Sequence, residues 1–74
     1  MTVTEFARKY KIPQSTVYNA SFRIPFEQRK EYNNNYPVDE LFRATYDELK
    51  GRIEYHQQRV DTNSSYLQTL LKEV

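Results

Sequence analysis

The sequence predicts a mainly α-helical fold in which two short helices joined by a tight turn precede a short β-hairpin and a C-terminal helical arm. Three observations predict it: apolar residues at helical spacing within residues 2–21, aromatic and turn-forming residues within 22–36, and an apolar repeat of alternating four and three residues from position 42. We expect residues 1–41 to form a compact domain and residues 42–74 the arm. With 74 residues and no cysteine, the chain has room for one small core and no disulfide framework.

The first helix is predicted to begin at Thr2. Thr2 and Glu5 have the spacing of a capping box, in which the hydroxyl accepts the Glu5 amide and the carboxylate accepts the Thr2 amide. Pro13 ends this helix nearby, because the residue before a proline is disfavoured in the α region, and proline suits the first turn of the next helix. An apolar stripe follows the cap, formed by Phe6, Ala7 and Tyr10.

A second helix is predicted over about residues 13–21, with Val17 and Ala20 on its buried face. Ile12 follows the turn and is expected to enter the same core. Two short helices joined in this way form a helix-turn-helix unit. Lys11 occupies the turn position where glycine is common, at a cost of about 1 kcal/mol. The alternative is that the two amphipathic helices belong to some other small bundle.

The hairpin is predicted over residues 22–36, where aromatic and β-branched residues flank a polar stretch. Phe22–Phe26 would lead in, the tip would lie within Glu27–Glu31, and Tyr32–Tyr36 would return. The asparagines at 33–35 are weak strand formers and offer a second place for the turn.

A long helix is predicted to begin near Pro37, where Asp39 and Glu40 complement the positive end of the helix dipole. Its apolar repeat favours a two-stranded coiled coil, although His56 and Asn63 are polar members of that seam. The residues expected to face a partner are Phe42, Tyr46, Leu49, Ile53, Val60, Leu67 and Leu70. The arm therefore predicts self-association or docking on another protein.

A break in this helix is the alternative to a continuous arm. Asp61–Ser65 are five poor helix formers in succession. Ser65 and Gln68 then have the spacing of a cap for a final short helix, which would fold back as a helical hairpin.

Charge is unevenly distributed along the chain. Residues 1–36 hold six basic and three acidic side chains, a net of +3, whereas residues 37–74 hold five and seven, a net of −2. No carboxylate lies between Glu5 and Glu27. A basic segment of this kind suits a polyanion, because each lysine or arginine near a phosphate releases a counterion. Ordinary fluctuation over a short chain is the other explanation.

The composition argues against catalysis, metal binding and membrane insertion. With His56 as its one histidine and no cysteine, the chain offers no metal cluster, and it has neither a triad spacing nor a glycine-rich phosphate loop. We therefore expect no enzyme activity, cofactor or metal. The longest wholly apolar run has two residues, and the N-terminal segment lacks the apolar stretch of a signal peptide. We expect a cytoplasmic protein with no membrane partner.

Together these features resemble the winged helix-turn-helix of excisionases and of mercury-resistance-type (MerR) regulators. The resemblance covers residues 2–42: the segment VTEFARKYKIPQSTVYN, the step Ile24-Pro25 after it, and an aromatic with an acidic helix start at residues 36–41. It implies a basic wing around residues 28–30, although the glycine usual at a wing tip is missing. No effector-binding domain follows, so the resemblance favours an excisionase-like or mobile-element accessory factor without a small-molecule effector.

The outward face of the second helix is expected to read DNA bases, because amides can bond adenine and hydroxyls can bond bases or phosphates. Its members are Gln14, Ser15, Tyr18 and Asn19. The basic residues expected to hold the phosphate backbone are Arg8, Lys9, Lys11 and Arg23, with Arg29 and Lys30 on the wing. A core position for Tyr18 and a solvated surface position for Asn19 are the alternatives.

The sequence thus predicts a small protein that binds duplex DNA, as a homodimer or as monomers that assemble on repeats. The alternative is an interaction module that docks on a replication or recombination enzyme and binds nucleic acid only in that complex. A net charge of only +1 and seven tyrosines keep this alternative open.

Overall fold

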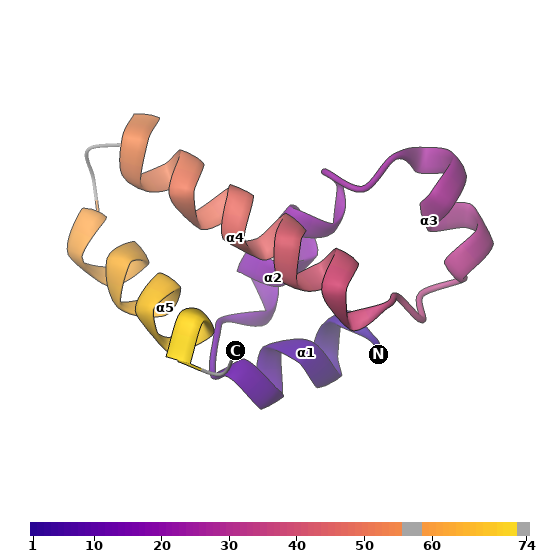
Figure 1. Cartoon of the computed structure of the whole chain (residues 1–74), viewed down its shortest axis with the longest axis horizontal. Coiled ribbons are helices and arrows are strands. Elements are labelled where there is room, and N and C mark those ends of the chain that lie inside the picture. The colour runs from indigo at the N-terminus through magenta and orange to yellow at the C-terminus, as the bar shows by residue number, and fades with distance from the viewer. Residues whose placement is uncertain (56–58, 73–74) are drawn as a thin grey trace.

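The computed structural model describes residues 1–55 and 59–72. Within them the chain forms five helices and no strand: α1 (Val3–Tyr10), α2 (Gln14–Ser21), α3 (Phe26–Tyr32), α4 (Val38–Tyr55) and α5 (Val60–Lys72). Figure 1 shows α4 lying across α2, α5 running back beside α4, and α3 set apart at one end. The fold is mainly α-helical, and the predicted β-hairpin wing is wrong.

The start of α1 and the turn after it form as predicted. The Thr2 hydroxyl accepts the Glu5 amide at 3.2 Å and the Glu5 carboxylate accepts the Thr2 amide at 3.2 Å, so the capping box is confirmed. The helix ends at Lys11, whose φ of 55° is left-handed. The Ile12 amide then donates to the Ala7 carbonyl at 3.0 Å, which closes the turn.

The core lies between α1, α2, α4 and α5. α2 buries Val17 and Ala20 completely, as predicted, where it packs against α1 and α4. α4 contributes Leu41 and Leu49, which are also fully buried. The remaining buried apolar residues are Phe6, Ala7, Tyr10, Ile12, Ile24, Tyr36, Ala44 and Leu70. The two helices and the tight turn predicted within residues 2–21 are therefore confirmed.

α3 occupies the segment predicted to form the hairpin. Residues 27–31 read Glu-Gln-Arg-Lys-Glu, all good helix formers, and Pro25 stands at the helix start, where its fixed φ is favourable. After the helix, Asn33 and Asn34 both take left-handed φ values, 49° and 68°. Asparagine tolerates this conformation better than most residues, so the asparagine run ends a helix instead of turning a hairpin.

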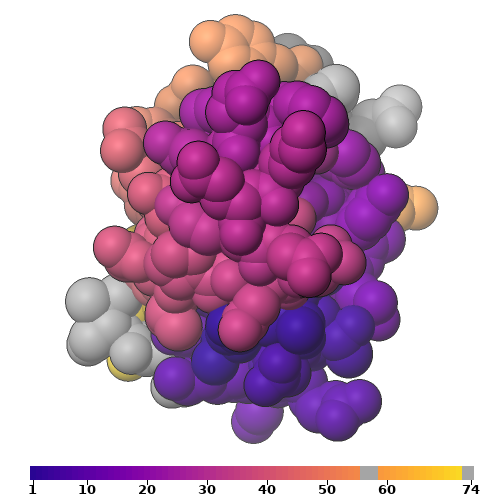
Figure 2. All heavy atoms as spheres, turned by 90° about the vertical axis from the view of Figure 1, so that its right-hand side faces the viewer, coloured from indigo at the N-terminus to yellow at the C-terminus, as the bar shows by residue number. Residues whose placement is uncertain are grey.

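α3 lies at the edge of the core, against which only its last residue, Tyr32, packs in a partly buried position. None of its side chains is buried, whereas Ile24 before it and Tyr36 after it are buried. The Tyr36 amide also donates to the Met1 carbonyl at 2.9 Å, which ties the link between α3 and α4 to the start of α1. Figure 2 shows α3 standing nearest the viewer at this end of the molecule.

α4 and α5 form a helical hairpin, so the chain does not extend a continuous arm. Leu49 and Leu70 are fully buried, and Tyr46 and Leu67 pack against the core in partly buried positions. The apolar repeat thus packs into the core of its own chain, because a short chain has little other apolar surface from which to build a core. Three more residues expected to face a partner are half-buried: Phe42, Ile53 and Val60.

The break between the two helices lies earlier than expected. α4 ends at Tyr55 and α5 begins at Val60, so Asp61–Ser65 lie within α5. The expected boundary between residues 41 and 42 falls inside α4, whose buried residues join the same core as those of α1 and α2. His56, assigned to the coiled-coil seam, lies outside the described residues.

Candidate nucleic-acid interface

One face of α2 is turned to solvent. Positions 14, 18 and 22 are about one helical turn apart, as are 15 and 19, so their side chains share a face. All five are exposed: Gln14, Ser15, Tyr18, Asn19 and Phe22. α2 therefore presents polar and aromatic groups opposite its buried face, and the core position considered for Tyr18 is not the one it takes.

The polar side chains of this face are partly fixed and partly free. Gln14 Nε2 donates to Thr4 Oγ1 at 3.0 Å, which ties the start of α2 to α1. Within residues 1–55 and 59–72, the side chains of Ser15 and Asn19 make no hydrogen bond, so both remain available to a ligand.

Exposed basic residues precede and follow this face along the chain. Arg8 and Lys9 lie in the last turn of α1, and Lys11 lies in the turn that leads to α2. Lys30 is exposed on α3. Because residues 6–26 contain no carboxylate, α2 itself adds no negative charge to oppose a polyanion.

Arg23, expected to contact phosphate, is held by α4. Its Nε donates to Glu48 Oε1 at 3.1 Å, and Arg52 Nε donates to Glu48 Oε2 at 3.0 Å. Arg52 also donates from Nη1 to Thr16 Oγ1 at 3.1 Å, which joins α4 to α2. Glu48 therefore balances part of the charge that Arg23 would otherwise present beside α2.

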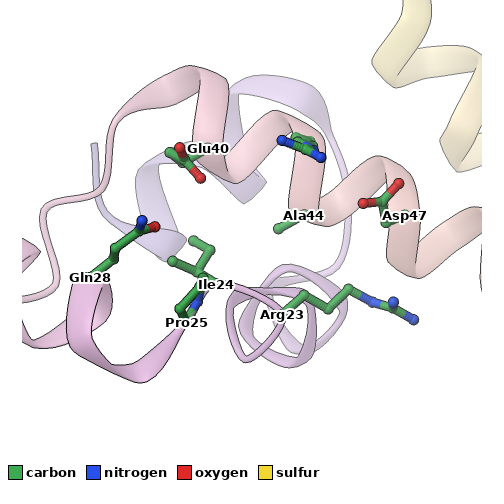
Figure 3. Close-up of a pocket in the computed structure, with 8 residues that line it drawn as sticks. Arg23, Ile24, Pro25, Gln28, Glu40, Ala44 and Asp47 are labelled. Carbon is green, nitrogen blue, oxygen red and sulfur yellow. The ribbon is translucent and has the colours of Figure 1, made fainter.

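A polar pocket lies where the link between α2 and α3 faces α4. Figure 3 shows Ile24, Pro25 and Gln28 on one side of it and Glu40 and Ala44 of α4 on the other. Charges of both signs line the pocket. Because they largely cancel, the electrostatic potential in the pocket favours neither a cation nor an anion. The charged residues are Arg23, Glu40, Arg43 and Asp47.

Arg29 lies on α3 and not on a wing. Its Nε donates to the Ile24 carbonyl at 3.0 Å, and its guanidinium carbon lies 4.9 Å from the ring centroid of Phe22 and 5.5 Å from that of Phe26. Tyr18 packs edge-on against Phe22, with ring centroids 5.0 Å apart. Both phenylalanines were expected in a strand and were missed as surface groups, although the four-residue spacing of Tyr18 and Phe22 was an available signal.

Other chemistry is sparse in the described ranges. There, no three side chains of the metal-binding types come close enough together to hold an ion, and no helix is both long and apolar enough to cross a membrane. The pKa of the Glu5 carboxyl is lowered, first because it accepts the Thr2 backbone amide and second because of the Thr2 side chain. This carboxyl belongs to the cap of α1 and not to the exposed face of α2.

Comparisons with protein families, curated proteins and solved structures found no match to this chain. The resemblance to excisionases and MerR-type regulators therefore rests on the motifs of residues 2–42, and α3 stands where that resemblance implies a wing. Function is inferred from the exposed face of α2 and the groups around it.

Proposed function

We propose that the protein binds duplex DNA with the exposed face of α2 in the major groove. The observation that carries the proposal is the orientation of α2, which the left-handed turn at Lys11 sets against α1 so that one whole face projects from the core. The second helix of a helix-turn-helix enters the major groove in this manner, with its N-terminal residues against the base edges. The major groove is wide enough to admit an α-helix.

The exposed face of α2 carries side chains suited to base edges. The amides of Gln14 and Asn19 can bond adenine at N6 and N7, and the Ser15 hydroxyl can bond a base or a phosphate. Tyr18 lies between them on the exposed face and offers its ring to a thymine methyl group. This set favours a site that contains adenine–thymine pairs.

Phosphate contacts come from the exposed cations that flank α2. Arg8, Lys9 and Lys11 lie at the end of α1 and in the turn, where a helix in the groove brings the neighbouring backbone close. Lys30 on α3 supplies the phosphate contact that the resemblance assigned to a wing. Arg23 contributes less, because its Nε is engaged by Glu48. Each phosphate contact releases a counterion, so binding weakens steeply as salt rises.

We propose a single copy of the chain as the binding unit. Self-association was expected because the arm would leave its apolar repeat uncovered. The hairpin of α4 and α5 removes that reason, since Leu49 and Leu70 are buried in the chain's own core. Repeated DNA sites would then recruit further copies independently.

The test is fluorescence anisotropy on a duplex enriched from a random pool and on an unselected duplex. Asn19→Ala is expected to lower affinity for the enriched duplex by about tenfold and to leave the unselected duplex nearly unchanged, since a bidentate amide contributes about 1–3 kcal/mol of discrimination. Gln68→Ala is the matched control, because Gln68 is an exposed amide on α5. It is expected to change neither affinity.

Failure of the isolated chain to bind any duplex in a salt-dependent way overturns the proposal. That outcome favours the second function, docking on a DNA-processing enzyme with nucleic-acid binding only in the complex.

A further inference from the structure

Three exposed aromatic rings lie together at the junction of α2 and α3, two of them against one guanidinium group. Tyr18, Phe22 and Phe26 expose 56%, 52% and 65% of their surface, and Arg29 lies over the two phenylalanine rings. We call these four residues the aromatic platform. Neighbouring exposed apolar rings on a small protein indicate a binding surface, because leaving them in water is unfavourable.

The platform is fixed in shape before any ligand binds. Tyr18 meets Phe22 edge-on at an interplanar angle of 88°. The bond from Arg29 Nε to the Ile24 carbonyl, 3.0 Å long, holds the guanidinium in place over the rings. Little side-chain freedom is lost when a ligand binds to groups that are already ordered in this way.

The chemistry of the platform suits nucleobases better than an apolar protein surface. Arg29 has donors beyond the one bonded to Ile24, and an apolar partner that covered them would leave a buried charge without compensation. A nucleic-acid strand supplies bases that stack on both rings and guanidinium planes, together with phosphates that accept the remaining donors. Lys30 follows Arg29 in α3 and adds an exposed cation next to the partly buried Arg29.

We propose that the aromatic platform stacks on unpaired bases of single-stranded DNA. The bases must be unpaired, because bases within a duplex have both faces covered by their neighbours. Phe22 and Phe26 lie at the end of α2 and the start of α3, whereas Gln14 and Ser15, which the proposed function places on duplex base edges, lie at the start of α2. Tyr18 lies between these two groups and belongs to both surfaces, so the variants that test the platform are made at Phe22 and Phe26. This inference rests on the proposed function only in placing the duplex contacts at the start of α2. Base-dependent binding to a single strand tests it separately.

The experiment compares two strands of equal charge. One is an oligothymidine of about 12 nucleotides, within the usual site size of a single-strand-binding surface, and the other is an abasic strand with the same number of phosphates. We expect the full chain to bind oligothymidine at least about tenfold more tightly than the abasic strand by fluorescence anisotropy. Phe22→Ala and Phe26→Ala are each expected to weaken oligothymidine binding about fivefold or more, with abasic binding unchanged.

Tyr55→Ala is the matched control, because Tyr55 is 81% exposed at the end of α4, outside the platform. It is expected to leave both affinities unchanged. Both phenylalanines are exposed, so their variants should keep the parent's melting temperature, which circular dichroism checks. Equal affinity for the two strands overturns the inference. So does a platform variant that changes the sedimentation mass without changing strand preference, since the rings would then join two copies of the chain.

The same measurements separate this inference from the proposed function. Loss of duplex binding with base-dependent single-strand binding retained contradicts only the proposed function. Sequence-dependent duplex binding without preference for oligothymidine over the abasic strand contradicts only the platform.

Discussion

Arg23, just after α2, donates to Glu48 of α4, with 3.1 Å between Nε and Oε1. The same carboxylate accepts from Arg52, so one acid on α4 holds two guanidinium groups beside α2. A Cβ at Gly51 would lie 3.2 Å from Arg23 Nη2, a tight contact that the end of the arginine side chain would relieve by moving a few tenths of an ångström. Glu48 thereby balances part of the positive charge at the end of α2.

Glu48→Gln is expected to strengthen duplex binding, because the change releases Arg23 toward phosphate. The slope of log affinity against log salt should steepen by about one unit. Stability should fall by no more than about 1 kcal/mol, since partly exposed ion pairs contribute little. Glu54→Gln is the control, because it changes the net charge by the same amount at an exposed position of α4. Equal gains in affinity for the two variants would show that only overall charge matters.

Leu70→Ala is expected to destabilise the whole fold by about 2–5 kcal/mol, because it opens a cavity in the shared core. Urea denaturation followed by circular dichroism measures the change. Its neighbour Leu71 is 48% exposed, so Leu71→Ala should alter stability by about 0.5 kcal/mol or less. If the two variants unfold alike, α5 is not part of the core and the hairpin with α4 is wrong.

Thr45→Val is expected to stabilise the protein by about 1 kcal/mol. The Thr45 hydroxyl is fully buried and has no hydrogen-bond partner in the described part of the chain, so replacing it with a methyl group removes an uncompensated polar atom. Thr16→Val should have the opposite sign, since Thr16 accepts from Arg52. Thermal melts of the two variants test the pair, and a loss of stability in Thr45→Val would contradict the assignment of an unpaired hydroxyl.

Acid should weaken the N-terminal cap of α1. The pKa of Glu5 is lowered in the folded protein, first by the Thr2 backbone amide and then by the Thr2 side chain. Its stabilising contribution is therefore present above the ordinary carboxyl pKa and is lost as pH falls through the lowered folded value. In Thr2→Val, a carboxyl titration followed by NMR should show the pKa of Glu5 moved up toward its ordinary range. An unchanged titration would mean that the Thr2 hydroxyl plays no part.

The first two helices could be predicted from sequence because their determinants are local. The cap at Thr2 and Glu5, the proline at position 13 and the apolar positions that follow act within a few residues of one another. The outward face of α2 follows directly from that periodicity. Local signals conflict in residues 22–36, where aromatic residues favour a strand and the charged middle favours a helix. The helix formed, and Phe22 and Phe26 became surface groups of α2 and α3.

The arrangement of α4 and α5 depends on information that periodicity does not contain. A seven-residue apolar repeat looks the same whether it packs on another copy or on the chain's own core. The break was also misplaced for a physical reason. Asp61–Ser65 are poor residues for a helix interior, yet small polar residues are favoured at a helix start, and α5 holds them in its first turns.

The peripheral position of α3 sets how its backbone amides should exchange with deuterium. None of its side chains is buried, so a local opening can break its helical hydrogen bonds while α1, α2 and α4 stay packed. Amides of Val17 and Leu49, by contrast, should become accessible only when the whole domain unfolds. A strand bound to α3 would therefore slow exchange there by a large factor and leave the slowest amides almost unaffected. Exchange at α3 is thus a local reporter of whether a strand is bound there.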